Sequence, residues 1–429
     1  MVKIKKKICI IGLGYIGLPT AAMFATRGHT IKGVDTNRNV VDALNQGRII
    51  IEEPYLDIMV QAAVTSGNLT ANTAPEESDV FIIAVPTPIN SDKTAHMAYV
   101  ENAAESIVPF LREGNIVILE STSPPGTVEK LLVPILEKSG LKTGSQLLVA
   151  HCPERVLPGK ILIELVENNR IIGGINRESC EAVRDLYRTF VKGEIFLTDA
   201  TTAEMCKLME NTFRDVNIAL ANELAILCEN LGINVWEVIK LSNKHPRVNL
   251  HQPGPGVGGH CLAVDPWFIV EKFPELAGII RLGRETNDRM PGFVCSKAKA
   301  ILAGVPGVKK VTILGVTYKP NIDDMRESPI IELIEHLEKD GGFSVNLVDP
   351  HVQSFKNLEA DLYQAAEGSH LVILGVNHDE FGRVDFNRLK KAMALPNVLD
   401  TRNFWDPGRV CGAGLNYFLL GSGQKVTGQ

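Results

Sequence analysis

Residues 7–35 read KICIIGLGYIGLPTAAMFATRGHTIKGVD, and this stretch decides the fold. An apolar run comes first, then a glycine cluster, an alanine-rich stretch compatible with a helix, and a second apolar run that ends at Asp35. A strand, a helix and a strand within about 30 residues form a βαβ unit. We therefore expect a parallel, doubly wound sheet at the start of the chain.

The turn in this unit predicts the ligand. Gly12, Gly14 and Gly17 have the spacing GxGxxG, in which the glycines allow a tight turn, close approach of a pyrophosphate, and close packing of helix on strand. Alone, GxGxxG can be an ordinary turn, but here it follows a strand, opens a helix and precedes an acid about 20 residues later. Asp35 would accept hydrogen bonds from ribose hydroxyls, which predicts NAD, although Arg38 nearby could accommodate the 2′-phosphate of NADP.

Length and composition narrow the class of protein. A chain of 429 residues is too long for one core, so two or three domains are expected. The net charge of -6 gives no reason to expect nucleic acid or an anionic membrane as partner. No apolar run reaches the roughly 18 residues of a membrane span, so we expect a cytoplasmic protein. The eight cysteines are scattered without CxxC or His/Cys ligand spacing, which predicts neither a metal site nor a disulfide framework.

Three further apolar runs, at 79–88, 115–127 and 146–159, end in polar loops. In a parallel sheet such loops face the ligand, although each of these side chains could also serve a turn or a helix cap. A second αβ pattern begins near residue 309 and lacks GxGxxG, so side chains would have to meet a phosphate there. The candidates from these loops are Thr87, Thr122, Thr127, Glu154, Tyr318, Lys319 and Arg326.

The sequence TTAEMCKLMENTFRDVNIALANELAILCENLG, from 201 to 232, predicts one helix of about 30 residues that could also form a dimer surface. At 100° per residue, Lys207, Asn211 and Arg214 share a side. This side is either functional or a solvated stripe, since Glu204, Glu210 and Asp215 lie near it. The opposite, apolar face is predicted to contain Leu208, Met209, Thr212, Val216, Ala219, Leu220 and Leu227.

The stretches GLGYIGLP, VPTP, ESTSPPGT, CPERVLPG, TAEMCKLMENTFRDVNIALANEL, GPGVGGHC and GVTYKPNIDDMRESP follow one another over nearly the whole chain. In this order they resemble the UDP-sugar 6-dehydrogenases of the UDP-glucose/UDP-mannose dehydrogenase family, which oxidise the C6 alcohol of a nucleotide sugar to a carboxylate. The resemblance implies an α/β fold with two Rossmann-like doubly wound domains joined by a long central helix and a helical middle domain. The expected domains are 1–198 for NAD, 199–300 for catalysis and dimerisation, and 301–429 for the UDP-sugar.

The resemblance also implies a mechanism. Cys261 in GPGVGGHCLAVDP would be the nucleophile, because an aldehyde can give up a second hydride only after a thiolate has added to it. The surrounding glycines would let the backbone approach the sugar closely, and their amides could favour the thiolate. Lys207 and Asn211 would stabilise the oxyanion, Glu154 would be the base for thioester hydrolysis, and Thr122 and Asp265 would position water. How Lys207, Asp265 and Glu154 divide the base duties stays open.

The remaining matches concern binding. Arg247 would reach a neighbouring subunit, so a homodimer is expected, with a UDP-sugar as substrate and NAD as cofactor. The sugar would contact Arg155, Val156, Lys207, Asn211, Arg214, His245, Arg247 and Gly258, and the UDP would contact Tyr318, Lys319 and Arg402. The cofactor would contact Gly12, Gly14, Tyr15, Ile16, Gly17, Asp35, Thr87, Thr127 and Arg326.

Two departures bear on the sugar. Enzymes for UDP-glucose commonly have a serine before the cysteine and a lysine before the aspartate, where this chain has His260 and Val264. ERVLPG and NKHPRVN instead are similar to the UDP-N-acetylmannosamine dehydrogenases of bacterial surface-polysaccharide pathways, with UDP-N-acetylglucosamine or UDP-glucose as alternative substrates.

Two rival classes of protein are a two-electron hydroxyacid dehydrogenase and a non-catalytic NAD sensor. The number of NADH formed per sugar distinguishes all three classes.

Overall fold

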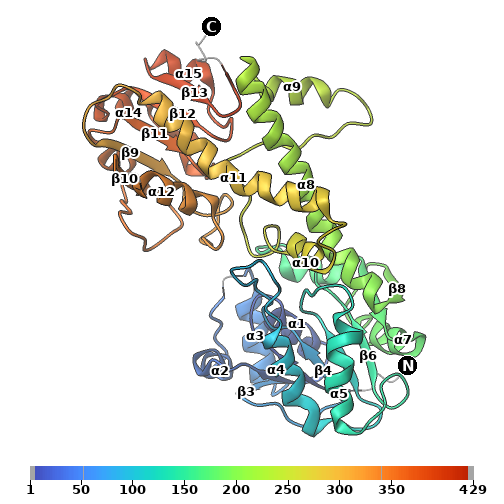
Figure 1. The fold of residues 1–429 in the computed structure, drawn as a ribbon. Coiled ribbons are helices and arrows are strands. Elements are labelled where there is room, and N and C mark those ends of the chain that lie inside the picture. The colour runs from blue at the N-terminus through green and yellow to red at the C-terminus, as the bar shows by residue number, and fades with distance from the viewer. Residues whose placement is uncertain (1–4, 52, 340, 424–429) are drawn as a thin grey trace. The chain divides into compact units, whose positions relative to one another are not determined.

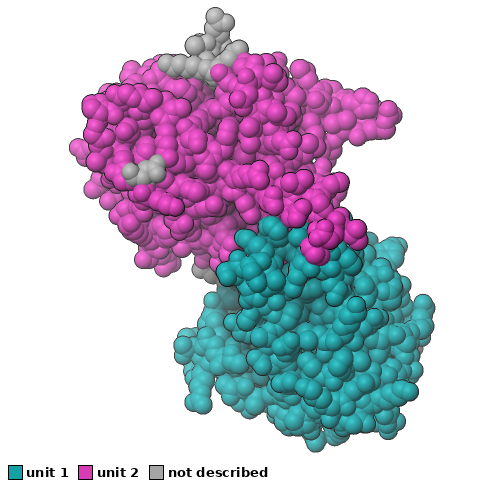
Figure 2. All heavy atoms as spheres, viewed as in Figure 1, with its two compact units in different colours: residues 1–210, 267–273 teal, residues 211–266, 274–429 magenta. Residues whose placement is uncertain are grey.

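The computed structural model describes residues 5–51, 53–339 and 341–423. Two compact units divide the chain: one comprises residues 1–210 and 267–273, the other residues 211–266 and 274–429 (Figure 2). Family resemblance led us to expect boundaries at 198 and 300, and these stay a prediction.

An eight-stranded sheet forms the centre of the first unit (Figure 1). Its first six strands have the order 3-2-1-4-5-6 of a dinucleotide-binding fold, which confirms the expected Rossmann-type domain. Cys9 of β1 is fully buried, as expected for a small core residue. The strands are β1 (Lys7–Ile11), β2 (Thr30–Val34), β3 (Leu69–Asn72), β4 (Val80–Ile83), β5 (Ile116–Leu119), β6 (Leu148–His151), β7 (Arg170–Gly174) and β8 (Ile195–Asp199).

Both faces of this sheet are buried, which explains why its strands are apolar runs without alternation. Ile8 and Ile10 of β1 pack into the core on one face, whereas Cys9 and Ile11 pack into the core on the other. The helices are α1 (Gly17–Thr26), α2 (Arg38–Asn45), α3 (Leu56–Thr65), α4 (Ala98–Ile107), α5 (Val133–Leu136), α6 (Ile161–Glu167) and α7 (Arg177–Tyr187), with shorter turns η1 (Val108–Phe110), η2 (Val128–Leu132) and η3 (Glu137–Ser139).

One feature of this sheet was not anticipated from the sequence. Strand β7 pairs antiparallel with β6, through Ala150 with Gly174 and His151 with Gly173, and β8 then pairs parallel with β7. The last two strands therefore run against the other six. Arg170, the first residue of β7, thereby contacts Glu154 in the loop that follows β6.

Helix α8 (Ala200–Leu231) is continuous over 32 residues and confirms the predicted long helix. Its predicted faces were partly wrong. Met209, Leu220 and Leu227 are 41%, 52% and 52% exposed, whereas Lys207 on the supposedly polar side is only 8% exposed. The solvated-stripe interpretation therefore fails for Lys207. The other central helices are α9 (Val235–Ser242), α10 (Asp265–Lys272) and α11 (Gly278–Ile301).

The C-terminal sheet has five parallel strands in the order β10-β9-β11-β12-β13, and Figure 1 shows helices over it. Within this domain the order is 2-1-3-4-5, the second common doubly wound arrangement, which confirms the expected second αβ domain. Its strands are β9 (Lys309–Leu314), β10 (Phe343–Val348), β11 (Leu371–Leu374), β12 (Asn397–Asp400) and β13 (Asn416–Leu419), and its helices are α12 (Pro329–Lys339), α13 (Leu362–Ala365), α14 (Phe386–Ala392) and α15 (Pro407–Gly412), with the short turn η4 (Asp379–Arg383).

Candidate active site

The glycine turn after β1 has the geometry that a dinucleotide requires. Gly12 has φ +96°, and a Cβ there would lie 2.5 Å from the carbonyl oxygen of Ala84. A Cβ on Gly17 would lie 1.8 Å from the carbonyl oxygen of Gly12. Gly14 instead faces open space, with no heavy atom within 4 Å of its Cβ position. Two glycines thus serve chain packing, and the third leaves room for a pyrophosphate at the N-terminus of α1.

Asp35 is held at the end of β2 by backbone donors. Its Oδ2 accepts from the N–H of Leu13 at 3.0 Å, and its Oδ1 accepts from the N–H of Asn37 at 2.9 Å. The carboxylate thereby links the glycine turn to the loop after β2, where the motif places the ribose-binding acid. Tyr15, Ile16 and Thr87 are half-buried in the loops that follow β1 and β4, the topological switch point of the sheet.

The loop after β5 contains Thr122, which is half-buried, and Thr127, whose hydroxyl donates to the carbonyl of Pro124 at 2.6 Å. Glu204 of α8, which we did not predict as functional, holds this loop by accepting from the N–H groups of Gly126 and Val128. Burial raises the pKa of Glu204 to about 7, against the opposing effect of those two donors. Its position directly after Ala203, near the start of the predicted helix, was the only sequence signal for it.

Glu154 is buried and both of its carboxylate oxygens have donors. Oε1 accepts from the N–H of Arg155 at 2.8 Å, and Oε2 pairs with Nη2 of Arg170 at 2.6 Å. Burial of an ion pair is tolerated best when its remaining hydrogen-bonding groups are satisfied; Glu154 meets this condition, whereas Nε of Arg170 is buried without a hydrogen-bond partner among the described residues. The sequence indicated Glu154 but not Arg170, because the contact between them depends on the antiparallel pairing of β7 with β6.

Arg170 extends the network into the core. Its guanidinium stacks on the ring of Tyr187, with 4.6 Å between the guanidinium carbon and the ring centroid. The Tyr187 hydroxyl donates a short hydrogen bond to Glu120. Burial, with a further contribution from the charge of Glu154, raises the pKa of Glu120 to about 7. Cys152 is fully buried beside Arg170, and burial raises the pKa of its thiol to about 12. Cys152 is thus kept as an inert thiol.

Three more predicted residues of the first unit are now placed. Arg155 pairs with Glu210 at 2.5 Å and lines a hollow of about 290 Å³ with Asn168 and Asn169. Val156 packs against the hydrophobic core. Lys207 is buried on α8, where its charge adds to the effect of burial in lowering the pKa of His151 to about 3. A buried lysine near the ends of β5 and β6 is well suited to stabilise an oxyanion.

The predicted thiol lies in the second unit, four residues before α10 begins at Asp265. The carbonyl of Cys261 accepts from the N–H of Val264 at 3.1 Å and of Asp265 at 2.8 Å, so the thiol precedes the first helical turn. Asp265 is 2% exposed, and its Oδ2 accepts from the amide of Asn211 at 2.6 Å. The structure therefore brings Cys261, Asp265 and Asn211 together.

The glycines before Cys261 lie in close contact with residues of the C-terminal domain. A Cβ on Gly254 would lie 2.6 Å from Nη1 of Arg402, and one on Gly259 would lie 2.9 Å from the ring of Tyr318. A Cβ on Gly256 or Gly258 would collide with Pro329 or with the carbonyl of Glu327. These glycines let the loop pack on the C-terminal domain, and their expected role toward a sugar stays a prediction.

The predicted nucleotide residues gather at the ends of the C-terminal strands. Tyr318 and Lys319 follow β9 and are half-buried. Arg402 follows β12, and its Nε donates to the carbonyl of Gly375 at 3.1 Å. Burial lowers the pKa of Arg402 to about 10, but the group remains a cation at neutral pH. Arg326 pairs with Asp324 at 2.7 Å, and its expected contact with the cofactor stays a prediction.

Arg214, His245 and Arg247 are exposed on α8 and on the segment after α9. Their roles in binding sugar or a second subunit stay predictions.

The described part of the chain contains no group of three or more His, Cys, Asp or Glu side chains able to hold a metal ion. None of the helices in that same part combines the length and apolarity needed to cross a bilayer.

Comparison with known proteins agrees with this geometry. Models of the UDP-glucose/GDP-mannose dehydrogenase family match three parts of the chain: the NAD-binding domain at residues 6–191, the central domain at 201–289 and the UDP-binding domain at 312–407. A UDP-N-acetyl-D-mannosamine dehydrogenase of Methanococcus maripaludis is 47% identical over 97% of each chain. An NDP-N-acetyl-D-galactosaminuronic acid dehydrogenase of Ralstonia solanacearum is also 47% identical, over 94% of this chain and 97% of the relative.

The solved structure of a UDP-D-ManNAc dehydrogenase from Pyrococcus horikoshii has a TM-score of 0.91 and 41% identity, covering 97% of this chain and 99% of the other. The glycine turn and Asp35 fit NAD, and the C-terminal domain fits the UDP of a nucleotide sugar. The chain belongs to the UDP-glucose/GDP-mannose dehydrogenase family and is an NAD-dependent UDP-sugar dehydrogenase.

Proposed function

We propose that this protein oxidises the C6 alcohol of a UDP-N-acetylhexosamine, UDP-N-acetyl-D-mannosamine in the first place, to the uronic acid in a four-electron reaction. The observation that carries the proposal is the grouping of Cys261 with Asp265 and Asn211 at the start of α10. A hydroxyacid dehydrogenase needs no such thiol, and a sensor needs none of the three residues. A role in bacterial surface-polysaccharide synthesis is part of the proposal and rests on the resemblance alone.

NAD, when bound at the glycine turn, supplies the hydride acceptor for each of the two oxidations. Lys207 and Asn211 stabilise negative charge on the C6 oxygen. Loss of a hydride from C6 and of the hydroxyl proton gives an aldehyde. The Cys261 thiolate adds to the aldehyde carbon and, once the oxygen has taken up a proton, gives a thiohemiacetal, whose remaining C–H bond can then be broken. Loss of that hydride leaves a thioester. Glu154 then acts as the base that takes a proton from a water molecule as this water attacks the thioester carbonyl. The thiolate leaves as the carboxylate forms.

The choice of sugar rests on relatives and on two residues. The Methanococcus maripaludis relative is named for UDP-N-acetyl-D-mannosamine, and the Ralstonia solanacearum relative for an N-acetylgalactosamine derivative. Both names contain an N-acetylated sugar, in agreement with His260 and Val264 at the positions where UDP-glucose enzymes carry serine and lysine.

A panel of UDP-sugars with NAD tests the assignment. We expect the highest kcat/KM with UDP-N-acetylmannosamine, lower values with the glucosamine and galactosamine epimers, and the lowest with UDP-glucose. If UDP-glucose is the best substrate, the proposed sugar class is wrong. If no UDP-sugar yields NADH, the proposed function is wrong and one of the two rival classes applies.

We also propose a homodimer. Phe213, Leu220 and Leu227 are 60%, 52% and 52% exposed, and they recur every seven residues along α8. A stripe with this spacing is typical of a seam between two helices, and a second copy of the chain supplies the same stripe. Leu220→Glu should convert the dimer to a monomer in analytical ultracentrifugation. Ile58→Glu, at an equally exposed residue of α3, is the control and should leave the mass unchanged. A monomeric unmodified protein would contradict the proposal.

A further inference from the structure

The strand order of the C-terminal sheet marks a second switch point. Connections leave β9 and β11 in opposite directions, and ligands of doubly wound sheets bind at the carboxyl ends of such strands. The loop after β9 contains Thr317 to Asn321, with the predicted nucleotide residues Tyr318 and Lys319. The segment after β11 contains His378, for which sequence analysis gave no role.

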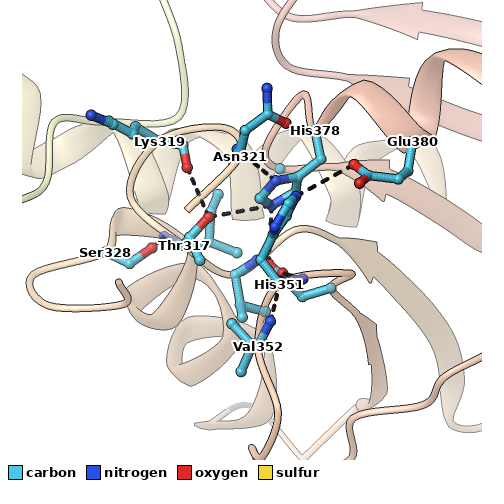
Figure 3. A network of polar contacts seen from close by, with 12 residues as sticks. Thr317, Lys319, Asn321, Ser328, His351, Val352, His378 and Glu380 are labelled. Atoms are coloured by element: carbon cyan, nitrogen blue, oxygen red, sulfur yellow. Dashed lines mark hydrogen bonds and ion pairs between the residues drawn. The ribbon is translucent and has the colours of Figure 1, made fainter. Parts of the chain in front are cut away.

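His378 is fully buried and uses both ring nitrogens (Figure 3). Its Nδ1 accepts from the backbone N–H of Asn321 at 2.9 Å, so the ring proton lies on Nε2. Nε2 is 3.1 Å from Oδ2 of Asp349 and 3.3 Å from the hydroxyl of Thr317. That hydroxyl donates to the carbonyl of Lys319 at 2.9 Å. One imidazole thereby holds both ends of the loop 317–321.

Asp349, at the end of β10, fixes the imidazole. Its carboxylate also accepts from the backbone N–H of Val316 at 2.7 Å and of His351 at 2.9 Å. Burial opposes the charge, but the hydrogen bonds from His378 and these two amides lower the pKa of Asp349 below its usual value. Asn321 has φ +61°, a left-handed conformation that needs support from its surroundings.

The other side of the loop supports the segment that carries the thiol. Cβ positions on Gly258 and Gly259 would each lie 2.9 Å from Tyr318, so the two backbones pack on this side chain without a gap. The N–H of Gly259 donates to the carbonyl of Arg326 at 3.2 Å. A shift of Tyr318 would therefore remove the surface on which the residues before Cys261 rest.

We propose that His378 is a positioning residue that fixes the loop 317–321, and through it both the nucleotide-binding side chains and the segment leading to Cys261. The inference rests on the proposed function, in which Tyr318 and Lys319 bind the UDP and Cys261 is the nucleophile. His378 itself touches neither substrate nor cofactor in this proposal.

Two substitutions separate the two ring contacts. His378→Asn places an amide oxygen where Nδ1 accepts from Asn321, but it removes the donor to Asp349 and Thr317. His378→Gln places an amide donor where Nε2 lies, but it removes the acceptor for Asn321. Each leaves a buried partner unsatisfied, and we expect each to weaken UDP binding by about 5- to 100-fold.

A pair of threonines supplies a milder test and its control. Thr317→Val removes only the hydroxyl that links His378 to Lys319, and it keeps the side-chain shape if the His378 variants fail to fold. Thr312→Val removes an equally buried hydroxyl of β9, which bonds to the carbonyl of Ala365 and to Ser369 instead. Both changes should lower the melting temperature, but only Thr317→Val should weaken UDP binding.

The measurements are the Kd for UDP by calorimetry and the rate at which iodoacetamide alkylates Cys261, followed by peptide mass spectrometry. We expect weaker UDP binding and an alkylation rate changed by at least about threefold in His378→Asn and Thr317→Val, with NAD binding unchanged. Unchanged UDP affinity in both variants, or equal weakening in Thr312→Val, would overturn the inference. Unchanged alkylation would overturn its extension to Cys261. An unmodified protein that binds UDP but oxidises no UDP-hexosamine would instead contradict the proposed function.

Discussion

Replacing Arg170 with methionine should damage both stability and the last step of the reaction. The side chain is 4% exposed, pairs with Glu154 at 2.6 Å and stacks on Tyr187 at 4.6 Å. Methionine retains much of the volume but leaves Glu154 as a buried carboxylate without a counter-ion. Burial already raises the pKa of Glu120 to about 7, and loss of the cation removes an effect that opposes this rise.

The magnitude follows from the burial of the pair. Removing one partner of a buried ion pair typically costs about 3–5 kcal/mol, because the remaining charge stays uncompensated. In a domain of about 200 residues this corresponds to a fall in melting temperature of about 6–20 °C. Glu154 also loses the donor that orients Oε2, so a base acting on water should be misplaced. Thioester hydrolysis should then slow by more than the earlier hydride transfers.

Arg284→Met is the matched control. Arg284 is also buried and pairs with a buried acid, Asp215, at 2.5 Å, but it lies in the other unit of the chain. Unfolding would be followed by circular dichroism, and the covalent adduct on Cys261 by intact mass during turnover. Both variants should be destabilised, but only Arg170→Met should accumulate the adduct. Adduct in neither variant, or equal amounts in both, would refute the link between Arg170 and the base.

Two further predictions concern charge and cofactor. Because the folded pKa of Glu120 is raised from 4.5 to about 7, its contribution to stability is present below pH 4.5 and is lost as the pH rises to 7. Relative to Glu120→Gln, the unmodified protein should lose about 1.4 kcal/mol of unfolding free energy per pH unit in this window. If urea titrations give parallel curves of stability against pH for the two proteins, the raised pKa is contradicted. Asp35→Asn should reduce the preference for NAD over NADP, and equal kcat/KM for both cofactors in the unmodified protein would defeat the role of Asp35.

Local sequence patterns predicted those parts of the fold that depend on short segments. GLGYIG, Asp35 and the apolar runs predicted the βαβ unit and the strands β4, β5 and β6, because turn geometry and strand burial depend on residues that are close together in the sequence. The position of Cys261 was found through its glycine-rich segment. The contacts of those glycines with Tyr318 and Arg402 could not be predicted, since they involve residues far away in the sequence.

Features that depend on distant contacts were missed. Arg170 reaches Glu154 only because β7 turns back along β6, and nothing in the sequence around either residue indicates an antiparallel strand. The faces of α8 were partly misassigned because a helix with several partners does not bury one continuous stripe. His378 was missed because its partners, Asp349 and Thr317, come from loops that meet only when the C-terminal sheet has formed.

The central claim is that Cys261 makes a second oxidation possible at one site. The most direct measurement counts NADH formed per UDP-N-acetylmannosamine consumed, in the unmodified protein and in Cys261→Ala. We predict two NADH per sugar for the unmodified protein, and for the alanine variant no uronic acid despite retained binding of NAD and UDP-sugar. Two NADH per sugar from the alanine variant would show that the thiol only packs in its loop. One NADH per sugar from the unmodified protein would show a two-electron dehydrogenase.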